Sequence, residues 1–396
     1  MFSTEKIKKL RAQTPHLDKG IHLNNAGASL MPSTVIQAIK DQIDLESQMG
    51  GYEAANFQKE KNEAFYQKLA QLIHTSPEHI AWATNATDAF NKALSAIPFQ
   101  QADTILTTKE DYASNYIAFF QLRKRYGLKI IQLPSLEEGG INLEKVEPLI
   151  KAHHPKLVAI THIPTSSGLI QDVEAIGDIC ENYDCWYIVD ACQSAGQLPL
   201  NVQKIKCDFL SASFRKFMRG PRGGGFLYTS KRVLEEGLEP MFMDLHSAFW
   251  DSPDSYKASA SAKRFESWER SCALVHGSLA AVDLAAELGL DQIAHRIQYL
   301  ADMLRKELAT IVPLKALDQG RKKGGIVTFY PKNWQAETFK QQLDQRGIRS
   351  SMVWTAYARF DLGKKAVPWA ARLSPHYYNT EEEIKEVVKT IKSILH

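Results

Sequence analysis

Short runs of apolar residues recur along the first two thirds of the chain, and helix-length segments separate them. The runs occur at Ile80–Thr84, Thr104–Thr108, Leu128–Leu133, Leu157–Thr161, Trp186–Val189 and Phe209–Ala212. Nearly continuous apolar runs of this length are typical of buried parallel strands. We therefore predict repeated β-α units with right-handed crossovers, that is, an α/β fold whose mostly parallel central sheet is covered by helices.

The last third of the chain has a different pattern. Two helices are predicted at Val275–Leu288 and Gln292–Ala309, and the second would lead into a smaller α+β domain. That domain would hold the strand Ile326–Tyr330 and the helices Glu337–Arg346 and Thr380–Leu395. We predict a large domain of residues 1–285 and a small C-terminal domain of residues 286–396. The segment Met241–Lys263 is expected to be irregular.

Composition and charge favour a small-molecule partner. The chain has 44% hydrophobic and 23% charged residues, and 48 basic against 45 acidic residues give a net charge of +3 spread along the sequence. Such a distribution indicates neither a nucleic-acid footprint nor a membrane-binding patch. No apolar run is long enough to cross a bilayer and the first residues lack an apolar signal core, so we expect a cytoplasmic protein. The five cysteines form no C-x-x-C pair, which argues against a disulfide framework and a metal site.

The segment Lys206–Ser230 places a basic pair in a glycine-rich turn. Arg215 and Lys216 follow the apolar run Phe209–Ala212, and four glycines precede the second run, Phe226–Tyr228. A lysine held between buried strands loses solvation, so its amine becomes a better nucleophile and can form a Schiff base with a carbonyl. The same pattern would also fit a basic surface hairpin.

Asp190 strengthens the first interpretation. It ends the strand Trp186–Val189, and the carboxyl ends of strands are where open α/β sheets bind ligands. A carboxylate there is placed to be the counter-ion of a pyridinium nitrogen, and pyridoxal phosphate (PLP) enzymes combine such an aspartate with a Schiff-base lysine.

The segments IVDACQSAG and SFRKFMRGPRGGGFLY resemble the class V aminotransferase family of fold-type-I PLP-dependent enzymes. This family includes cysteine desulfurases, isopenicillin epimerase-like proteins and carbon–sulfur lyases. The resemblance extends from LNNAGAS at Leu23 to RLSPHYYNTEEEI at Arg372. It implies pyridoxal 5′-phosphate as cofactor, Lys216 as its Schiff-base residue and Asp190 as the partner of its ring nitrogen. It also implies a homodimer in which RFESWERS lies near the partner chain, and N-terminal residues that pack against the small domain.

The resemblance implies further cofactor contacts. Ala86 and Thr87, at a predicted helix start with free N–H groups, would hold the phosphate, although Thr87 could instead be a simple N-cap. Tyr112 stands where the family has a stacking ring, often histidine, and a phenol can stack but is a poorer proton shuttle near neutral pH. The remaining implied contacts are Thr165 and Gln193 near the phenolic O3′, Ser213 at the phosphate, and Arg215 in place of the usual histidine.

Two residues are expected to contact the substrate. By the resemblance, Arg372 would receive the α-carboxylate in a bidentate fashion, and Asn25 would help to form the pocket. Taken alone, Arg372 could also be a surface ion-pair partner and Asn25 an ordinary turn residue.

For the reaction, we predict a carbon–sulfur β-lyase that acts on an amino acid without a persulfide cysteine. The reason is that the loop Ser350–Lys365, where desulfurases of the family carry a nucleophilic thiol, contains no cysteine. The alternative is an aminotransferase that uses a 2-oxo acid, and a more remote one is a non-catalytic binding protein that keeps the fold.

Overall fold

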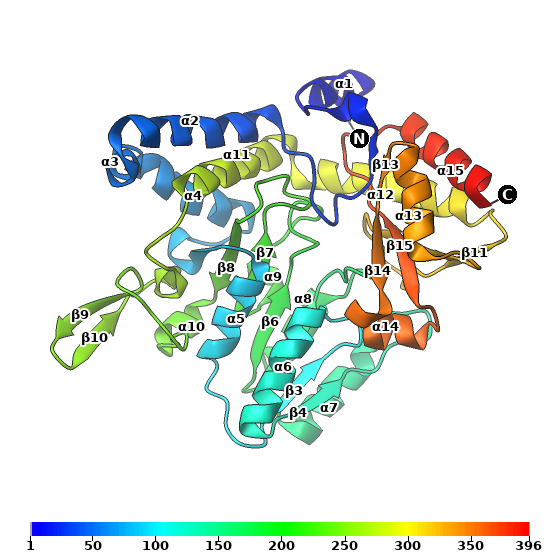
Figure 1. Ribbon diagram of the computed structural model, residues 1–396. Coiled ribbons are helices and arrows are strands. Elements are labelled where there is room, and N and C mark those ends of the chain that lie inside the picture. Colours follow the sequence, from blue (N-terminus) through cyan, green and yellow to red (C-terminus); the bar gives the residue numbers. More distant parts are fainter. Residues whose placement is uncertain (1, 396) are drawn as a thin grey trace.

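A seven-stranded sheet forms the centre of the computed structural model, which describes residues 2–395 (Figure 1). Its strand order is β2-β8-β7-β6-β5-β3-β4, and only β8 is antiparallel to its neighbours. The predicted mostly parallel sheet is therefore confirmed. The strands are β2 (Ile80–Ala83), β3 (Thr104–Thr107), β4 (Lys129–Gln132), β5 (Leu157–Thr161), β6 (Trp186–Asp190), β7 (Phe209–Ser213) and β8 (Gly225–Thr229).

Successive residues of each strand enter different cores, because side chains alternate between the faces of a sheet. In β6, Tyr187 and Val189 join a hydrophobic cluster with α4, α7, α8 and α11, whereas Trp186 and Ile188 join a second cluster with α5 and α6. Both faces are thus buried, which explains the continuous apolar runs. The helices of this part are α4 (Lys59–Leu72), α5 (Ala86–Ala96), α6 (Ala113–Tyr126), α7 (Val146–His153), α8 (Val173–Cys180), α9 (Val202–Ile205), α10 (Lys231–Glu235) and α11 (Cys272–Leu288).

The C-terminal part is built on a four-stranded antiparallel sheet in the order β11-β12-β15-β14. Its core forms a separate hydrophobic cluster with α12, α13 and α15. Helix α15 begins with a capping box, in which Thr380 Oγ1 accepts from Glu383 N at 3.2 Å and Glu383 Oε2 accepts from Thr380 N at 3.1 Å. The elements are α12 (Leu290–Leu308), β11 (Leu314–Ala316), β12 (Val327–Pro331), α13 (Ala336–Gln345), β14 (Ser351–Trp354), α14 (Arg359–Lys364), β15 (Trp369–Leu373) and α15 (Glu381–Leu395).

The N-terminal segment runs beside the C-terminal part (Figure 1). Helix α1 (Thr4–Ala12) is tied to it by Arg11, whose Nη1 lies 2.8 Å from Glu383 Oε1. Strand β1 (Ile21–His22) pairs in parallel with β13 (Ile348–Arg349). The chain then continues into α2 (Ser33–Met49) and α3 (Gly51–Phe57). The domain boundary at residues 285/286 stays a prediction.

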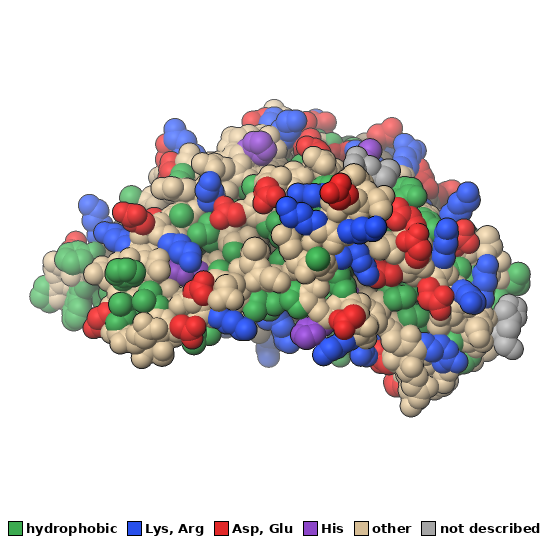
Figure 2. All heavy atoms as spheres, turned by 90° about the horizontal axis from the view of Figure 1, so that it is seen from above, with side chains coloured by type: hydrophobic (Ala, Val, Ile, Leu, Met, Phe, Trp, Pro, Cys, Tyr) green, Lys and Arg blue, Asp and Glu red, His purple; other side chains and the backbone are tan. Residues whose placement is uncertain are grey.

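The segment Met241–Lys263 was expected to be irregular, but part of it forms a β-hairpin. Strands β9 (Ala248–Ser252) and β10 (Ser255–Ala258) pair in antiparallel fashion and project from the body of the molecule (Figure 1). Phe249 and Trp250 are 73% and 67% exposed. Apolar side chains gather at the corresponding edge in Figure 2, whereas positive and negative side chains are interspersed over the rest of that face.

Within residues 2–395, no single helix is long and apolar enough to cross a membrane. Helices α11 and α12 taken together have the length and the apolar composition of a membrane span, but they meet at an angle of 83°.

Candidate active site

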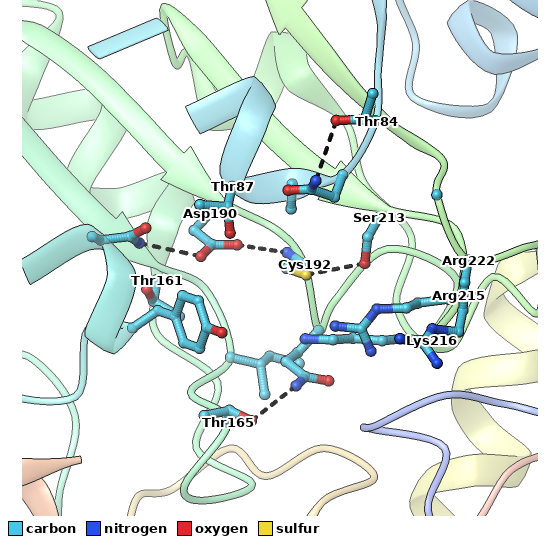
Figure 3. A pocket seen from close by; sticks show the side chains of 17 residues that line it. Thr84, Thr87, Thr161, Thr165, Asp190, Cys192, Ser213, Arg215, Lys216 and Arg222 are labelled. Atoms are coloured by element: carbon cyan, nitrogen blue, oxygen red, sulfur yellow. Dashed lines mark hydrogen bonds between the residues drawn. The ribbon is translucent and has the colours of Figure 1, made fainter. Parts of the chain in front are cut away.

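A cavity of about 310 Å³ lies at the carboxyl ends of β5, β6 and β7 (Figure 3). Every residue predicted to contact the cofactor lines it. These residues are Ala86, Thr87, Tyr112, Thr165, Asp190, Gln193, Ser213, Arg215 and Lys216. The fold therefore collects these side chains from five separate segments, as expected at the strand ends of an open α/β sheet.

Lys216 lies in the turn between β7 and β8 and is only 7% exposed. The alternative of a surface hairpin is therefore wrong. Burial lowers the pKa of Lys216, and the neighbouring Arg215 lowers it further, while Cys192 and Asp190 act in the opposite direction. The amine is thus shifted toward its neutral, nucleophilic form.

The turn that carries Lys216 is held by a second buried cation, Arg219. Its guanidinium donates to Leu30 O at 2.9 Å, to the Tyr377 hydroxyl at 2.7 Å and to Thr14 Oγ1 at 2.7 Å. These partners belong to the N-terminal segment and to the chain before α15. Distant parts of the sequence therefore fix the position of the lysine turn.

Asp190, at the end of β6, is 5% exposed. Its Oδ1 accepts from the backbone N–H of Cys192 at 2.9 Å, and its Oδ2 accepts from Asn115 Nδ2 at 3.2 Å. Burial raises the pKa of Asp190, whereas the Cys192 N–H, Lys216 and Asn115 lower it. The carboxylate is therefore held in a fixed orientation by two donors.

The start of α5 faces the same cavity. Its N-cap is Asn85, whose side chain accepts from Asp88 N at 2.9 Å, so the interpretation of Thr87 as the N-cap is wrong. A Cβ at Gly225 would lie 2.7 Å from the backbone carbonyl carbon of Asn85, so this glycine lets the helix start close to β8. The N–H groups of the first helical turn have no partner inside the helix and suit an anionic group.

A chain of hydrogen bonds links Gln193 to Arg372 through Thr165. Gln193 Nε2 donates to Thr165 Oγ1 at 3.2 Å, and Arg372 Nη1 donates to the same oxygen at 2.5 Å. Arg372 is 7% exposed, and burial lowers its pKa to about 10, with nearby Arg215 also lowering it. Across the described residues it makes no ion pair, so the alternative of a surface ion-pair partner is wrong.

Neither predicted substrate residue lines the cavity directly. Arg372 reaches it through Thr165, as described above. Asn25 is fully buried, donates from Nδ2 to Ser374 O at 2.7 Å and accepts from the Tyr378 hydroxyl at 2.6 Å. The structure thus gives Asn25 contacts that tie the N-terminal segment to the C-terminal part, and does not bring it into the cavity.

The residues present fit pyridoxal phosphate. Gln193 lines the cavity, and its Oε1 is buried without a hydrogen-bond partner among residues 2–395. A buried carboxylate, a buried amine and a helix start surround the same space. The carboxylate matches the ring nitrogen of PLP, the amine matches its reactive carbonyl, and the helix start matches its phosphate.

Several cavity residues were missed from the sequence. They are Asn115, Thr161, Cys192 and Arg222. Asn115 lies one helical turn from Tyr112, and Cys192 lies two residues from Asp190, so spacing from residues already identified could have indicated both. Arg222 has no ion-pair or hydrogen-bond partner between residues 2 and 395, and its place in the glycine-rich turn was the available signal.

Glu266, in the segment RFESWERS, is a buried carboxylate with several hydrogen-bond and ion-pair partners. Its carboxylate accepts from the Tyr66 hydroxyl at 2.8 Å and from Trp82 N at 2.7 Å, and it lies 2.8 Å from Arg270 Nη1. Glu266 is therefore a buried residue of this segment, at 3% exposure. Proximity to a partner chain stays a prediction.

Comparisons with known proteins agree with one another. A family model described as aminotransferase class-V matches residues 21–387. A probable cysteine desulfurase of Methanothermobacter thermautotrophicus is 26% identical over 98% of both chains. A probable cysteine desulfurase of Borreliella burgdorferi is 28% identical over 99% of this chain and 97% of its own. The apo structure of a cysteine desulfurase from Thermococcus onnurineus NA1 has a TM-score of 0.91 and 25% identity, and covers 100% of this chain and 98% of its own.

These similarities overturn the predicted reaction. The relatives are named cysteine desulfurases, so the prediction of a β-lyase without a persulfide cysteine is wrong. That prediction depended on one loop, Ser350–Lys365, which contains no cysteine. The argument failed because a thiol can reach a site from any segment that lines it, and Cys192 lines this cavity.

Proposed function

The chain belongs to the class V aminotransferase family, and we propose that it is a PLP-dependent cysteine desulfurase. The expectations of this family, of a PLP-dependent enzyme and of PLP as cofactor are confirmed. The observation that carries the proposal is a cavity that places Lys216 and Asp190 together in a chain similar over its whole length to named cysteine desulfurases.

The cavity residues divide into groups that would hold the cofactor. We assign covalent attachment to Lys216, the ring nitrogen to Asp190 and the phenolic oxygen to Gln193 and Thr165. Tyr112 would cover one face of the ring. When bound, PLP supplies an electron sink for the Cα atom of an amino acid.

The phosphate would sit at the start of α5. Ala86 and Thr87 offer N–H groups and a hydroxyl there, and Ser213 lines the same cavity. Arg215 and Arg222 add two positive charges to the cavity lining beside Lys216 (Figure 3). A permanent guanidinium favours an anion but cannot accept a proton, so we assign both arginines to charge neutralisation and not to proton transfer.

Substrate binding would depend on Arg372. Among residues 2–395, its buried Nε has no partner, and only Thr165 and Asn24 accept from its terminal nitrogens. A carboxylate would satisfy the remaining donors of this guanidinium. Lys216, freed from the cofactor, would then take the α-proton at Nζ, and its lowered pKa suits it to act as a base.

Removal of sulfur needs a thiol acceptor. Cys192 is the one cysteine that lines the cavity in the described part of the chain, and its Sγ lies 3.1 Å from Ser213 Oγ. Attack by this sulfur would form a sulfur–sulfur bond and break the carbon–sulfur bond of cysteine. The electron pair would remain on the substrate, which would leave as alanine after protonation, so no external oxidant or reductant is required.

We also assign the chain to a homodimer. The support is the exposed apolar hairpin β9–β10, which stands next in sequence to RFESWERS, the segment expected near the partner chain. Exposed apolar patches of this kind are typical of interaction surfaces. A cytoplasmic location stays a prediction.

A spectral titration tests the proposed substrate. The PLP-loaded protein is titrated with L-cysteine and with L-serine, which differs only by oxygen in place of sulfur. We expect the cofactor absorption to respond to both, because each has an α-amine and an α-carboxylate, and alanine to form only from cysteine. Absence of alanine from cysteine would contradict the proposal.

A further inference from the structure

A buried carboxylate, Asp111, lies behind the cavity without lining it. It is 6% exposed and follows β3. Its Oδ2 accepts from Thr107 Oγ1 at 2.5 Å, and its Oδ1 accepts from Thr161 Oγ1 at 2.5 Å. Thr107 belongs to β3 and Thr161 to β5, so the carboxylate bridges two neighbouring strands.

Asn115 connects Asp111 to the cavity. Its Nδ2 lies 2.9 Å from Asp111 Oδ1 and 3.2 Å from Asp190 Oδ2. An amide nitrogen carries two hydrogens, so it can donate to both carboxylates at once. Asn115 is only 2% exposed, so these bonds are shielded from bulk solvent. The orientation of Asp190 thus depends on Asp111 through one intermediate side chain.

The same carboxylate also fixes Tyr112. The backbone N–H of Tyr112 donates to Asp111 Oδ1 at 2.7 Å, directly before α6 begins. The Tyr112 ring lines the cavity. Asp111 is therefore connected to both residues that we assign to the cofactor ring, to Tyr112 directly and to Asp190 through Asn115.

We infer that Asp111 is a positioning residue that orients Asp190 and Tyr112 for the cofactor. The inference rests on the cofactor contacts assigned under the proposed function. Burial raises the pKa of Asp111 to about 6, the hydrogen bonds from Thr107, Thr161 and Asn115 act in the opposite direction, and Asp190 raises it again, so the carboxyl group is mostly anionic at neutral pH. A second negative charge behind Asp190 also favours a protonated, positively charged ring nitrogen in front of it.

The test compares Asp111→Asn with Asp208→Asn. Asp208 is a matched control, because it is 8% exposed and accepts from Tyr187 N at 2.9 Å and Ser230 Oγ at 3.0 Å. It precedes β7, at the end of that strand away from the cavity. Three quantities are measured for each apo-protein and its PLP complex: the melting temperature, the dissociation constant of PLP, and the visible circular dichroism of bound PLP.

We expect both variants to lower the melting temperature of the apo-protein. Only Asp111→Asn should weaken PLP binding, by about tenfold, as loss of an outer partner does at metal ligands, and reduce the visible dichroism. Wild-type PLP affinity and dichroism in Asp111→Asn would show a purely structural role and overturn the inference.

A second variant keeps the test available if Asp111→Asn does not fold. Asn115→Ala removes the bridge while Thr107, Thr161 and the Tyr112 N–H still satisfy Asp111. We expect the same two changes at the cofactor, and wild-type values would again overturn the inference. If these changes occur but L-cysteine yields no alanine, the proposed function fails and the positioning role stands.

Discussion

The Nη1 atom of Arg372 donates a hydrogen bond to the Oγ1 atom of Thr165 at 2.5 Å. Arg372 belongs to β15 of the C-terminal sheet, whereas Thr165 follows β5 of the central sheet and lines the cavity. This contact therefore joins the two parts of the molecule at the site. Through this contact, an arginine without a carboxylate partner among residues 2–395 is held directly behind the cavity residue Thr165.

Truncation of Arg372 should separate substrate binding from cofactor binding. We expect Arg372→Ala to keep PLP bound and visible and to weaken amino-acid binding by roughly 2 to 5 kcal/mol, the usual cost of truncating a buried charge pair. Arg372→Lys is the control, because it keeps the charge and loses the planar fork, and should give an intermediate effect. Loss of PLP with unchanged amino-acid affinity would contradict the assignment.

Lys216 should carry the cofactor. Borohydride reduction of the PLP-loaded protein, followed by peptide mapping, is expected to place the pyridoxyl group on this lysine, because burial lowers its pKa. Lys216→Ala should lose the adduct, while Lys231→Ala, at an exposed lysine of α10, should keep it. An adduct on another lysine, with Lys216→Ala fully active, would refute this assignment.

Strand positions and most site residues could be predicted because their signals are local. Burial on both faces makes each central strand a continuous apolar run, and the residues that follow β5, β6 and β7 fall at one edge of the sheet. Lys216 and Asp190 were identified in this way, whereas Gln193 was implied by the family resemblance, and all three line the cavity. The sequence does not distinguish between Asn85 and Thr87 as the N-cap of α5, since both are good capping residues, and the structure shows that Asn85 accepts the N–H.

Other features depend on tertiary contacts that no local pattern shows. The β9–β10 hairpin was missed because its aromatic residues face outward and give no buried stripe. Asn115 looks like any polar residue of an amphipathic helix until α6 packs beside β6. The reaction was predicted wrongly because a nucleophile was sought in one loop, whereas a cavity collects side chains from many segments.

Cys192 should be the site of the persulfide. After incubation with L-cysteine, peptide mass spectrometry is expected to find one extra sulfur atom on this residue. Cys192→Ser should abolish the modification and lower alanine formation by about 100-fold or more, as removal of a nucleophile does. Cys272→Ser is the control, since Cys272 lies outside the cavity lining. A persulfide on another cysteine, or full activity of Cys192→Ser, would contradict the assignment.

The protein should sediment as a dimer, and the hairpin should contribute to its interface. We expect Trp250→Glu to shift the equilibrium toward monomer, because it places a charge on an apolar surface that is 67% exposed in one chain. Val312→Glu changes an equally apolar position that is 92% exposed, outside the hairpin, and should leave the dimer intact. A fully active monomeric wild-type protein would contradict the dimer.

The products formed from L-cysteine test the proposed activity most directly. The PLP-loaded wild-type protein is incubated with L-cysteine, and alanine, pyruvate, ammonia and protein-bound persulfide are quantified together, with Lys216→Ala as the inactive control. A cysteine desulfurase predicts alanine with an equivalent amount of transferred sulfur, and neither pyruvate nor ammonia. Pyruvate and ammonia without a persulfide, or amino transfer that requires a 2-oxo acid, would contradict it.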